Sequence, residues 1–271
     1  MVERTAAPRR VLVTGGAGYL GSVLSEHLLA AGHSVTVLDN LMYGGPGPLH
    51  LAANERFSFV CGDARDGRVL RELLGSADVV IPLAAIVGMP ACNRDPELAR
   101  SINLEAVRLL NRLRGREQLV IFPTTNSGYG TKSGQTFCTE ETPLEPISLY
   151  GETKVEAEAE LLGSPNAMSL RLATVFGCSP RMRLDLLVND FVWRAVRDGF
   201  LVLYEPHFKR NYVHIRDVAD CFLFAIDEAE PMVGRAFNVG LDDANLSKHE
   251  LALAIAAHGL SVVTEGHCGT Q

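Results

Sequence analysis

The segment Arg10–Gly21 constrains this chain more than any other part of its sequence. An apolar run, Arg10–Thr14, leads into the glycines Gly15, Gly18 and Gly21, and an amphipathic helix is predicted directly after them. Glycine lets a backbone approach a bound pyrophosphate, and a helix start offers unpaired N–H groups and a partial positive charge to it. The spacing is one residue wider at its start than the usual G-x-G-x-x-G and favours a dinucleotide site.

The end of the next predicted strand indicates which dinucleotide is bound. Ser34–Leu38 is followed by Asp39, about 20 residues beyond the glycines, where a carboxylate can bind a ribose diol. Such a carboxylate would repel a 2′-phosphate, and residues 40–43 contain no base. The sequence therefore favours NAD over NADP.

Apolar and amphipathic runs alternate through the first two thirds of the chain and predict an α/β fold. The predicted strands are Arg10–Thr14, Ser34–Leu38, Phe57–Cys61, Val79–Leu83, Leu119–Pro123 and Ala167–Leu172, and the predicted helices are Ser22–Ala31, Arg68–Leu74, Pro96–Leu113 and Tyr150–Leu162. Continuously apolar strands are typical of a parallel sheet covered by helices on both faces. We expect a Rossmann, doubly wound domain over residues 1–178. A smaller lobe, interleaved with the last sheet elements, is expected over residues 179–271.

Composition excludes several classes of partner. The 271 residues carry 25 basic and 32 acidic side chains, a net charge of −7 without a basic cluster, so neither nucleic acid nor a membrane surface is indicated. No apolar run approaches the roughly 20 residues that span a bilayer, and no signal peptide is recognisable. Six scattered cysteines suggest a reduced, cytoplasmic protein. The histidines lack metal-ligand spacing, so no metal is predicted.

Two further segments indicate acid/base chemistry. Phe122–Gly130 places hydroxyl groups at a strand end, and Tyr150 begins a helix that carries Lys154 one turn later. On a helix these two side chains share one face. We expect the lysine to stabilise the phenolate and to lower the pKa of Tyr150 from about 10. Such a tyrosine can move a proton of a sugar hydroxyl while NAD takes the hydride.

Together these segments resemble the extended short-chain dehydrogenases/reductases, within the nucleotide-sugar epimerase/dehydratase family. The resemblance covers roughly residues 10–250. The motifs that carry it are Thr14–Gly21, Cys61–Asp63, Leu83–Ala85, Asn103, Thr125–Gly130, Tyr150–Lys154 and Phe237–Gly240. It implies a nucleotide-sugar substrate, an NAD cofactor and a homodimer.

The resemblance also implies roles for individual residues. Thr125, Tyr150 and Lys154 would be catalytic, with Lys154 also holding the nicotinamide ribose and Asp63 contacting the adenine amino group. The implied cofactor-binding set is Gly15, Gly18, Tyr19, Leu20, Gly21, Asp39, Asn40, Asp63, Ala64, Leu83, Ala84, Ala85, Asn103, Tyr150 and Lys154. The implied substrate-binding set is Asn126, Ser127, Thr174, Arg181, Asn189 and Arg210, with Arg210 gripping the diphosphate.

The reaction follows from two positions after Thr125. Members that remove water carry Asp and Glu there, whereas this chain has Asn126 and Ser127, which are a poor acid/base pair near neutral pH. Decarboxylating members keep a glutamate at the place of Ser127. The resemblance therefore favours 4-epimerisation of a UDP-hexose or UDP-hexuronate through a 4-keto sugar. A 4-ketoreductase or dehydratase, or an NAD-binding pseudoenzyme, is the alternative.

Three points stay open at this stage. Arg181 or Arg183 could pair with a C6 carboxylate, or both could be solvated. Val107, Leu110, Val155 and Leu161 could form the seam of a homodimer or pack against the sheet. Relatives typically run longer, and the polar end at residues 262–271 suggests a shortened substrate lobe.

Overall fold

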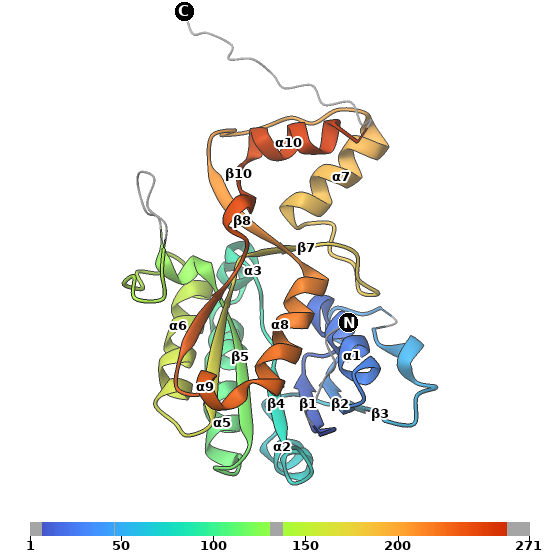
Figure 1. The fold of residues 1–271 in the computed structure, drawn as a ribbon, viewed down its shortest axis with the longest axis vertical. Helices are drawn as coiled ribbons and strands as arrows, with labels where there is room; N and C mark the ends of the chain where they lie inside the picture. Colours follow the sequence, from blue (N-terminus) through green and yellow to red (C-terminus); the bar gives the residue numbers. More distant parts are fainter. Residues whose placement is uncertain (1–6, 46, 131–137, 259–271) are drawn as a thin grey trace, which may run out of the picture.

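A computed structural model describes residues 7–45, 47–130 and 138–258, and it places a parallel sheet at the centre of the molecule (Figure 1). The seven strands lie in the order β3-β2-β1-β4-β5-β6-β9, all parallel. They are β1 (Arg10–Thr14), β2 (Ser34–Asp39), β3 (Phe57–Cys61), β4 (Val79–Pro82), β5 (Leu119–Thr125), β6 (Ala167–Leu172) and β9 (Ala236–Val239). This order confirms the predicted doubly wound Rossmann fold.

Helices cover both faces of the sheet because successive strand residues point to opposite sides. On one face, Val11 and Val13 of β1 pack with α1 (Tyr19–Ala30) and α8 (Ile215–Asp227). On the other face, Leu12 packs with the second helical layer. That layer consists of α2 (Gly67–Leu74), α5 (Ala106–Leu113) and α6 (Leu149–Leu162). The exception is the edge strand β3, which is largely exposed, so its predicted burial on both faces is wrong.

The predicted helix at residues 96–113 consists of three segments. These are α4 (Pro96–Arg100), the π-type segment η2 (Ser101–Glu105) and α5. Ahead of them lies α3 (Met89–Arg94), and the short turns are η1 (Leu49–Leu51), η3 (Asn126–Tyr129) and η4 (Asp242–Ala244). π-type segments are frequent at functional sites, and this one faces the end of β4.

A smaller sheet carries the lobe at the top of Figure 1. Its strands lie in the order β10-β8-β7, with β7 (Thr174–Phe176), β8 (Lys209–His214) and β10 (Asn245–Ser247). α7 (Leu187–Asp198) and α10 (Lys248–Ala256) pack beside it, and α9 (Ala229–Met232) follows α8. The predicted short end of the lobe falls on residues 262–271, which lie outside the described residues.

The four apolar residues considered either for a homodimer seam or for packing against the sheet are buried or partly buried in the fold. Val107, Leu110 and Leu161 are 5%, 2% and 1% exposed and pack against the sheet, so the core interpretation holds for them. Val155 is partly buried against Gly128. The outer face of α5 and α6 is instead charged, with Arg108 bonded to Glu105, Glu156 and Glu160. A homodimer stays a prediction.

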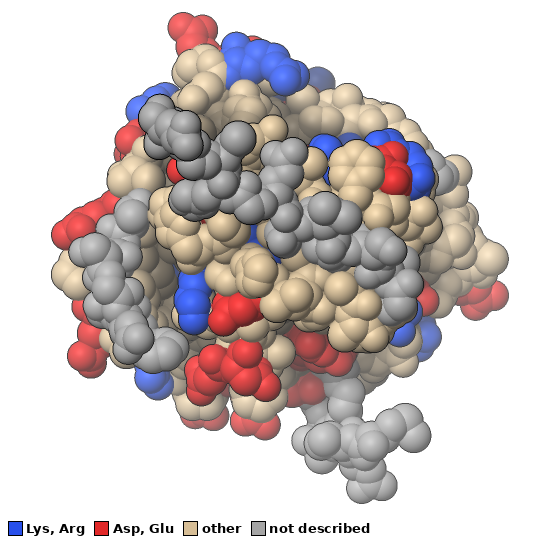
Figure 2. Space-filling view, turned by 90° about the horizontal axis from the view of Figure 1, so that it is seen from above, with Lys and Arg blue, Asp and Glu red and all other residues tan. Residues whose placement is uncertain are grey.

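Charge on the visible end of the molecule is mixed, with acidic and basic side chains interspersed (Figure 2). None of the helices in the described ranges is long and apolar enough to cross a bilayer. The same ranges hold no cluster of His, Cys, Asp and Glu suited to a metal ion. The five cysteines that they contain are free, and Cys268 lies outside them.

Candidate active site

The glycines of the turn lie so close to other backbone atoms of the protein that side chains would collide there. Gly15 has φ +71°, and a Cβ there would lie 2.5 Å from the backbone nitrogen of Ala84. A Cβ on Gly21 would lie 2.5 Å from Gly16 Cα. Gly18 caps α1 without a side-chain bond, and the first turn of the helix holds no acidic residue. The first N–H groups of α1 therefore face the turn and fit the pyrophosphate of a dinucleotide.

This close approach gives a direct test of the turn. Gly15→Ala is expected to lower the free energy of unfolding by about 1–3 kcal/mol, because a side chain at positive φ is strained and would also collide with Ala84. NAD binding should fall by about tenfold or more if the displaced backbone removes about 1.4 kcal/mol of contact. Thermal melts with and without NAD measure both effects.

Gly32→Ala is the matched control for that substitution. Gly32 also has positive φ, +94°, but its added Cβ would meet nothing within 4 Å. It should therefore show the strain without the loss of NAD binding. Equal NAD affinity in both variants would contradict the proposed role of the turn.

Asp39 ends β2 and faces the same turn. Its carboxylate accepts hydrogen bonds from Ala17 N at 3.0 Å and Leu41 N at 2.8 Å. A pocket beside it is lined by Ala17, Gly18, Asp39, Leu41, Tyr43, Gly44 and Arg181. The geometry fits a ribose diol held by Asp39 next to phosphates at the start of α1.

The same pocket contains a cation that sequence reasoning did not place there. Arg181 follows Asp39 by 142 positions in the chain, yet its guanidinium lies 5.1 Å from the ring centroid of Tyr43 at the pocket. Residues 40–43, which follow Asp39 directly, contain no base. In the sequence, the basic residues at 181–183 are the sign of a cation in this part of the chain. Their position beside Asp39 depends on how the lobe folds.

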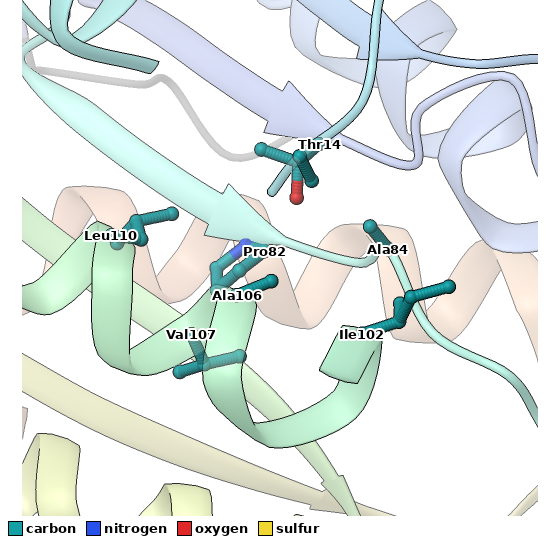
Figure 3. Close-up of a pocket in the computed structure, with 8 residues that line it drawn as sticks. Thr14, Pro82, Ala84, Ile102, Ala106, Val107 and Leu110 are labelled. Atoms are coloured by element: carbon teal, nitrogen blue, oxygen red, sulfur yellow. The ribbon is translucent and has the colours of Figure 1, made fainter. Parts of the chain in front are cut away.

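An apolar pocket lies on the other side of the β1 end (Figure 3). Pro82 and Ala84 from the end of β4 face Ile102, Ala106 and Val107 of the helical layer, and Thr14, Ala64 and Leu110 complete the lining. Its lining is apolar apart from the hydroxyl of Thr14.

Asp63 and Asn40 border the region between these pockets. Asp63 forms a two-point ion pair with Arg65, and this bonding holds the pKa of the carboxyl below its usual range. The amide of Asn40 also bonds to Asp63. Asp63 is partly buried, next to Ala64 of the apolar pocket. Its predicted contact with adenine stays a prediction.

Tyr150 and Lys154 lie one turn apart at the start of α6, which Ser148 caps through its side chain. Tyr150 packs against the apolar cluster of Ile86, Cys92, Ala99 and Ile102. Burial raises the pKa of Tyr150 to about 12, with Cys92 raising it further and Arg183 opposing the shift. The predicted lowering of this pKa by Lys154 is therefore wrong for the protein without cofactor.

Lys154 is itself changed by its surroundings. It is 4% exposed, and its ammonium lies 4.0 Å from the ring centroid of Phe122. Burial lowers the pKa of Lys154 to about 7, and the charge of Glu158 acts in the opposite direction. A lysine with a pKa near 7 is only about half protonated at pH 7, so it attracts a phenolate less than a fully charged lysine would.

Thr125 ends β5 and caps the turn η3. Its hydroxyl accepts a hydrogen bond from Ser127 N at 3.1 Å and so caps the turn. Asn126 is partly buried and Ser127 is exposed. The contacts between β5 and α6 bring the Thr125 segment and the Tyr150 helix together, as the motif predicts.

The side chain of Asn103 in η2 forms its hydrogen bonds with other groups of the protein. Its side chain accepts from Ile86 N at 2.8 Å and donates to Ile86 O at 3.0 Å. It also reaches Thr153 Oγ1 at 3.4 Å. These bonds fix the chain after Leu83, Ala84 and Ala85 against α6, so Asn103 positions the predicted cofactor wall.

Tyr19 and Asn189 join the glycine turn to the lobe. The Tyr19 hydroxyl donates to Gly177 O at 2.7 Å and accepts from the Asn189 amide at 3.1 Å. Asn189 also bonds to Gly177 N and Arg183 O. Tyr19, predicted to bind the cofactor, and Asn189, predicted to bind the substrate, are therefore hydrogen-bonded to each other. The aliphatic Leu20, next in the turn, packs against the core.

The remaining predicted substrate residues lie on the small sheet and its loop. Thr174 begins β7 and pairs with Tyr212, while Arg210 is exposed on β8. Arg183 forms an ion pair with Asp185 and is the arginine whose charge acts on Tyr150. His214 caps α8 by accepting from Arg216 N.

Known proteins share this arrangement. The family model described as the NAD dependent epimerase/dehydratase family matches residues 11–240. A "UDP-glucose 4-epimerase" of Mycolicibacterium smegmatis is 34% identical over 260 residues, which cover 91% of this chain and 82% of the relative.

Solved structures agree with the sequence comparison. A UDP-glucuronic acid 4-epimerase from Bacillus cereus, in complex with UDP-glucuronic acid and NAD, has a TM-score of 0.82 at 25% identity and covers 94% and 85% of the two chains. A dTDP-glucose 4,6-dehydratase from Streptomyces venezuelae with NAD bound has a TM-score of 0.81 at 25% identity, with coverage of 94% and 84%.

Proposed function

The chain belongs to the NAD-dependent epimerase/dehydratase family and is an NAD-dependent nucleotide-sugar epimerase, and from this premise we propose that it inverts C4 of a UDP-hexose. Residues 1–178 would hold the cofactor, and residues 179–271 would mainly hold the substrate. The proposal is supported by two contacts with the chain that follows β4: Gly15 of the glycine turn lies against Ala84, and Tyr150 of α6 packs against the cluster of Ile86.

The roles of the side chains follow from their chemistry. The phenolate form of Tyr150 would take the proton of the C4 hydroxyl, with Thr125 bonded to the same oxygen, and a protonated Lys154 would support that phenolate and the nicotinamide ribose. Bound NAD supplies the hydride acceptor. After the keto sugar has turned, the hydride would return from the reduced cofactor to the other face of C4, and Tyr150 would return the proton to the same oxygen. Asn126 and Ser127 supply no acid/base pair for loss of water, which favours epimerisation over dehydration.

A UDP-hexuronate is the second candidate substrate, and one observation favours it. Arg183 lies close enough to Tyr150 for each to shift the pKa of the other, so a cation borders the reacting centre. A guanidinium there is suited to a C6 carboxylate. Arg183 is, however, already paired with Asp185, which favours the neutral hexose as substrate. Arg181 lines the pocket beside Asp39 and not the region of Tyr150.

Incubation with UDP-glucose and, separately, UDP-glucuronate tests the proposal. We expect one of them to reach an equilibrium with its C4 epimer without net formation of NADH, measured by NMR and by absorbance of the cofactor. A stable 4-keto-6-deoxy product would establish dehydration instead. Retained NAD without turnover of either sugar would favour the pseudoenzyme.

A further inference from the structure

A buried ion pair lies beneath the catalytic helix. Arg171 of β6 and Glu158 of α6 have side chains that are 8% and 3% exposed. Arg171 donates to the Glu158 carboxylate through Nη2 at 2.6 Å and through Nε at 3.0 Å and 3.2 Å. A charge pair so fully removed from water needs further hydrogen bonds to be retained.

Both partners have those further bonds. Glu158 Oε2 accepts from Thr124 Oγ1 at 2.8 Å and from Ser169 Oγ at 2.6 Å. Arg171 Nη1 donates to the Tyr129 hydroxyl at 2.9 Å and to a backbone carbonyl at 3.0 Å. The pair therefore ties β5, β6 and α6 together at a fixed geometry.

Glu158 is also placed to act on the proposed proton relay. Tyr150, Lys154 and Glu158 follow one another at intervals of four residues, so they lie along one face of α6. Glu158 is the charged group that acts on Lys154, whose ammonium lies over the ring of Phe122.

The other charges on elements around α6 act elsewhere. On the outer face, Arg100 of α4 pairs with Glu152, and Arg108 of α5 pairs with Glu105, Glu156 and Glu160. Cys92 of α3 and Arg183 of the loop before α7 act on Tyr150. Glu158, which forms an ion pair with Arg171, is thus the charged group that acts on Lys154.

We propose that Arg171 and Glu158 are positioning residues that set the pH range in which Lys154 is protonated. The carboxylate of Glu158 interacts with two cations: it is hydrogen-bonded to Arg171, and its charge also acts on Lys154. Without Glu158, Lys154 loses its attracting charge. Without Arg171, the full charge of Glu158 acts on Lys154. The turnover part of this inference rests on the proposed function, whereas its effect on Lys154 does not.

The two substitutions should therefore act in opposite directions. Burial already holds the pKa of Lys154 near 7 against the attraction of Glu158. Glu158→Gln should move loss of the Lys154 proton to lower pH, and Arg171→Met should move it to higher pH, each by about one pH unit. A purely structural pair would alter stability without opposite shifts.

Two readouts measure the shift in the full chain. The basic limb of kcat/KM with a UDP-hexose reports it during turnover. The pH dependence of the melting temperature of the cofactor-free protein reports it without any turnover. Shifted melting profiles without turnover of a nucleotide-sugar would support the effect on Lys154 and contradict only the proposed function.

Tyr129→Phe is the matched control, because it removes a neutral partner of Arg171 and leaves both charges. It should move neither readout. If a single variant fails to fold, the double variant Glu158→Gln/Arg171→Met buries no unpaired charge and should shift in the direction of Glu158→Gln. Shifts of both single variants in one direction, or an unmoved double variant, would overturn the inference.

Discussion

Replacing Tyr150 by phenylalanine is expected to lower kcat by about 10²–10⁴-fold, the range typical of a lost general acid/base group. NAD affinity should stay nearly unchanged, because the ring still packs against Ile86, Cys92, Ala99 and Ile102. Burial keeps the Tyr150 phenol protonated in the free protein, so the variant removes a proton carrier and no charge. Steady-state kinetics and NAD titration measure the two effects.

Tyr204→Phe provides the control for that experiment. Tyr204 is 78% exposed and lies before β8 in the lobe, away from α6. It should leave kcat and NAD affinity as they are. Equal turnover in Tyr150→Phe and Tyr204→Phe would refute the role of Tyr150.

Lys154→Met should lower turnover by at least about 10²-fold and weaken NAD binding, while it stabilises the cofactor-free protein. The gain in stability follows from burial, which lowers the pKa of Lys154 from 10.5 to about 7. Each pH unit between the folded and unfolded values corresponds to about 1.4 kcal/mol. Methionine fills similar space without that cost.

The pH dependence of stability provides an independent check. Between pH 7 and 10.5 the unfolded chain binds the Lys154 proton and the folded chain does not, so the free energy of unfolding should rise with pH. In Lys154→Met this contribution to the rise should disappear. The contrary result is a wild-type free energy of unfolding that falls with pH over this window, together with a falling difference between the wild type and Lys154→Met. That result would show that Lys154 is charged in the folded protein.

Most of the central sheet could be predicted from local sequence. The runs that form β1, β3 and β6 have the predicted bounds, although β3 is an edge strand and is largely exposed. The last sheet strand, β9, is not among the predicted strands; it lies at the edge of the sheet and pairs with β6, a strand more than 60 residues earlier in the chain. The three-residue strands β7 and β10 likewise depend on partners distant in the chain.

Some features of the candidate site could likewise be predicted from short motifs, whereas others depend on the folded structure. Gly15, Asp39, Tyr150 and Lys154 belong to short motifs with fixed geometry, so sequence alone suggested them. The position of Arg181 beside Asp39 depends on how the lobe folds over the sheet. The raised pKa of Tyr150 depends on the side chains that exclude water around it, and spacing along a helix carries no such information.

The most direct test of the central claim follows a label through one reaction. UDP-glucose deuterated at C4 is incubated with the protein and NAD, and the product is examined by NMR and mass spectrometry. Epimerisation predicts UDP-galactose that keeps the deuterium at C4, since the same bound cofactor takes and returns it. Loss of the label from C4, or a product lighter by one water, would contradict the account.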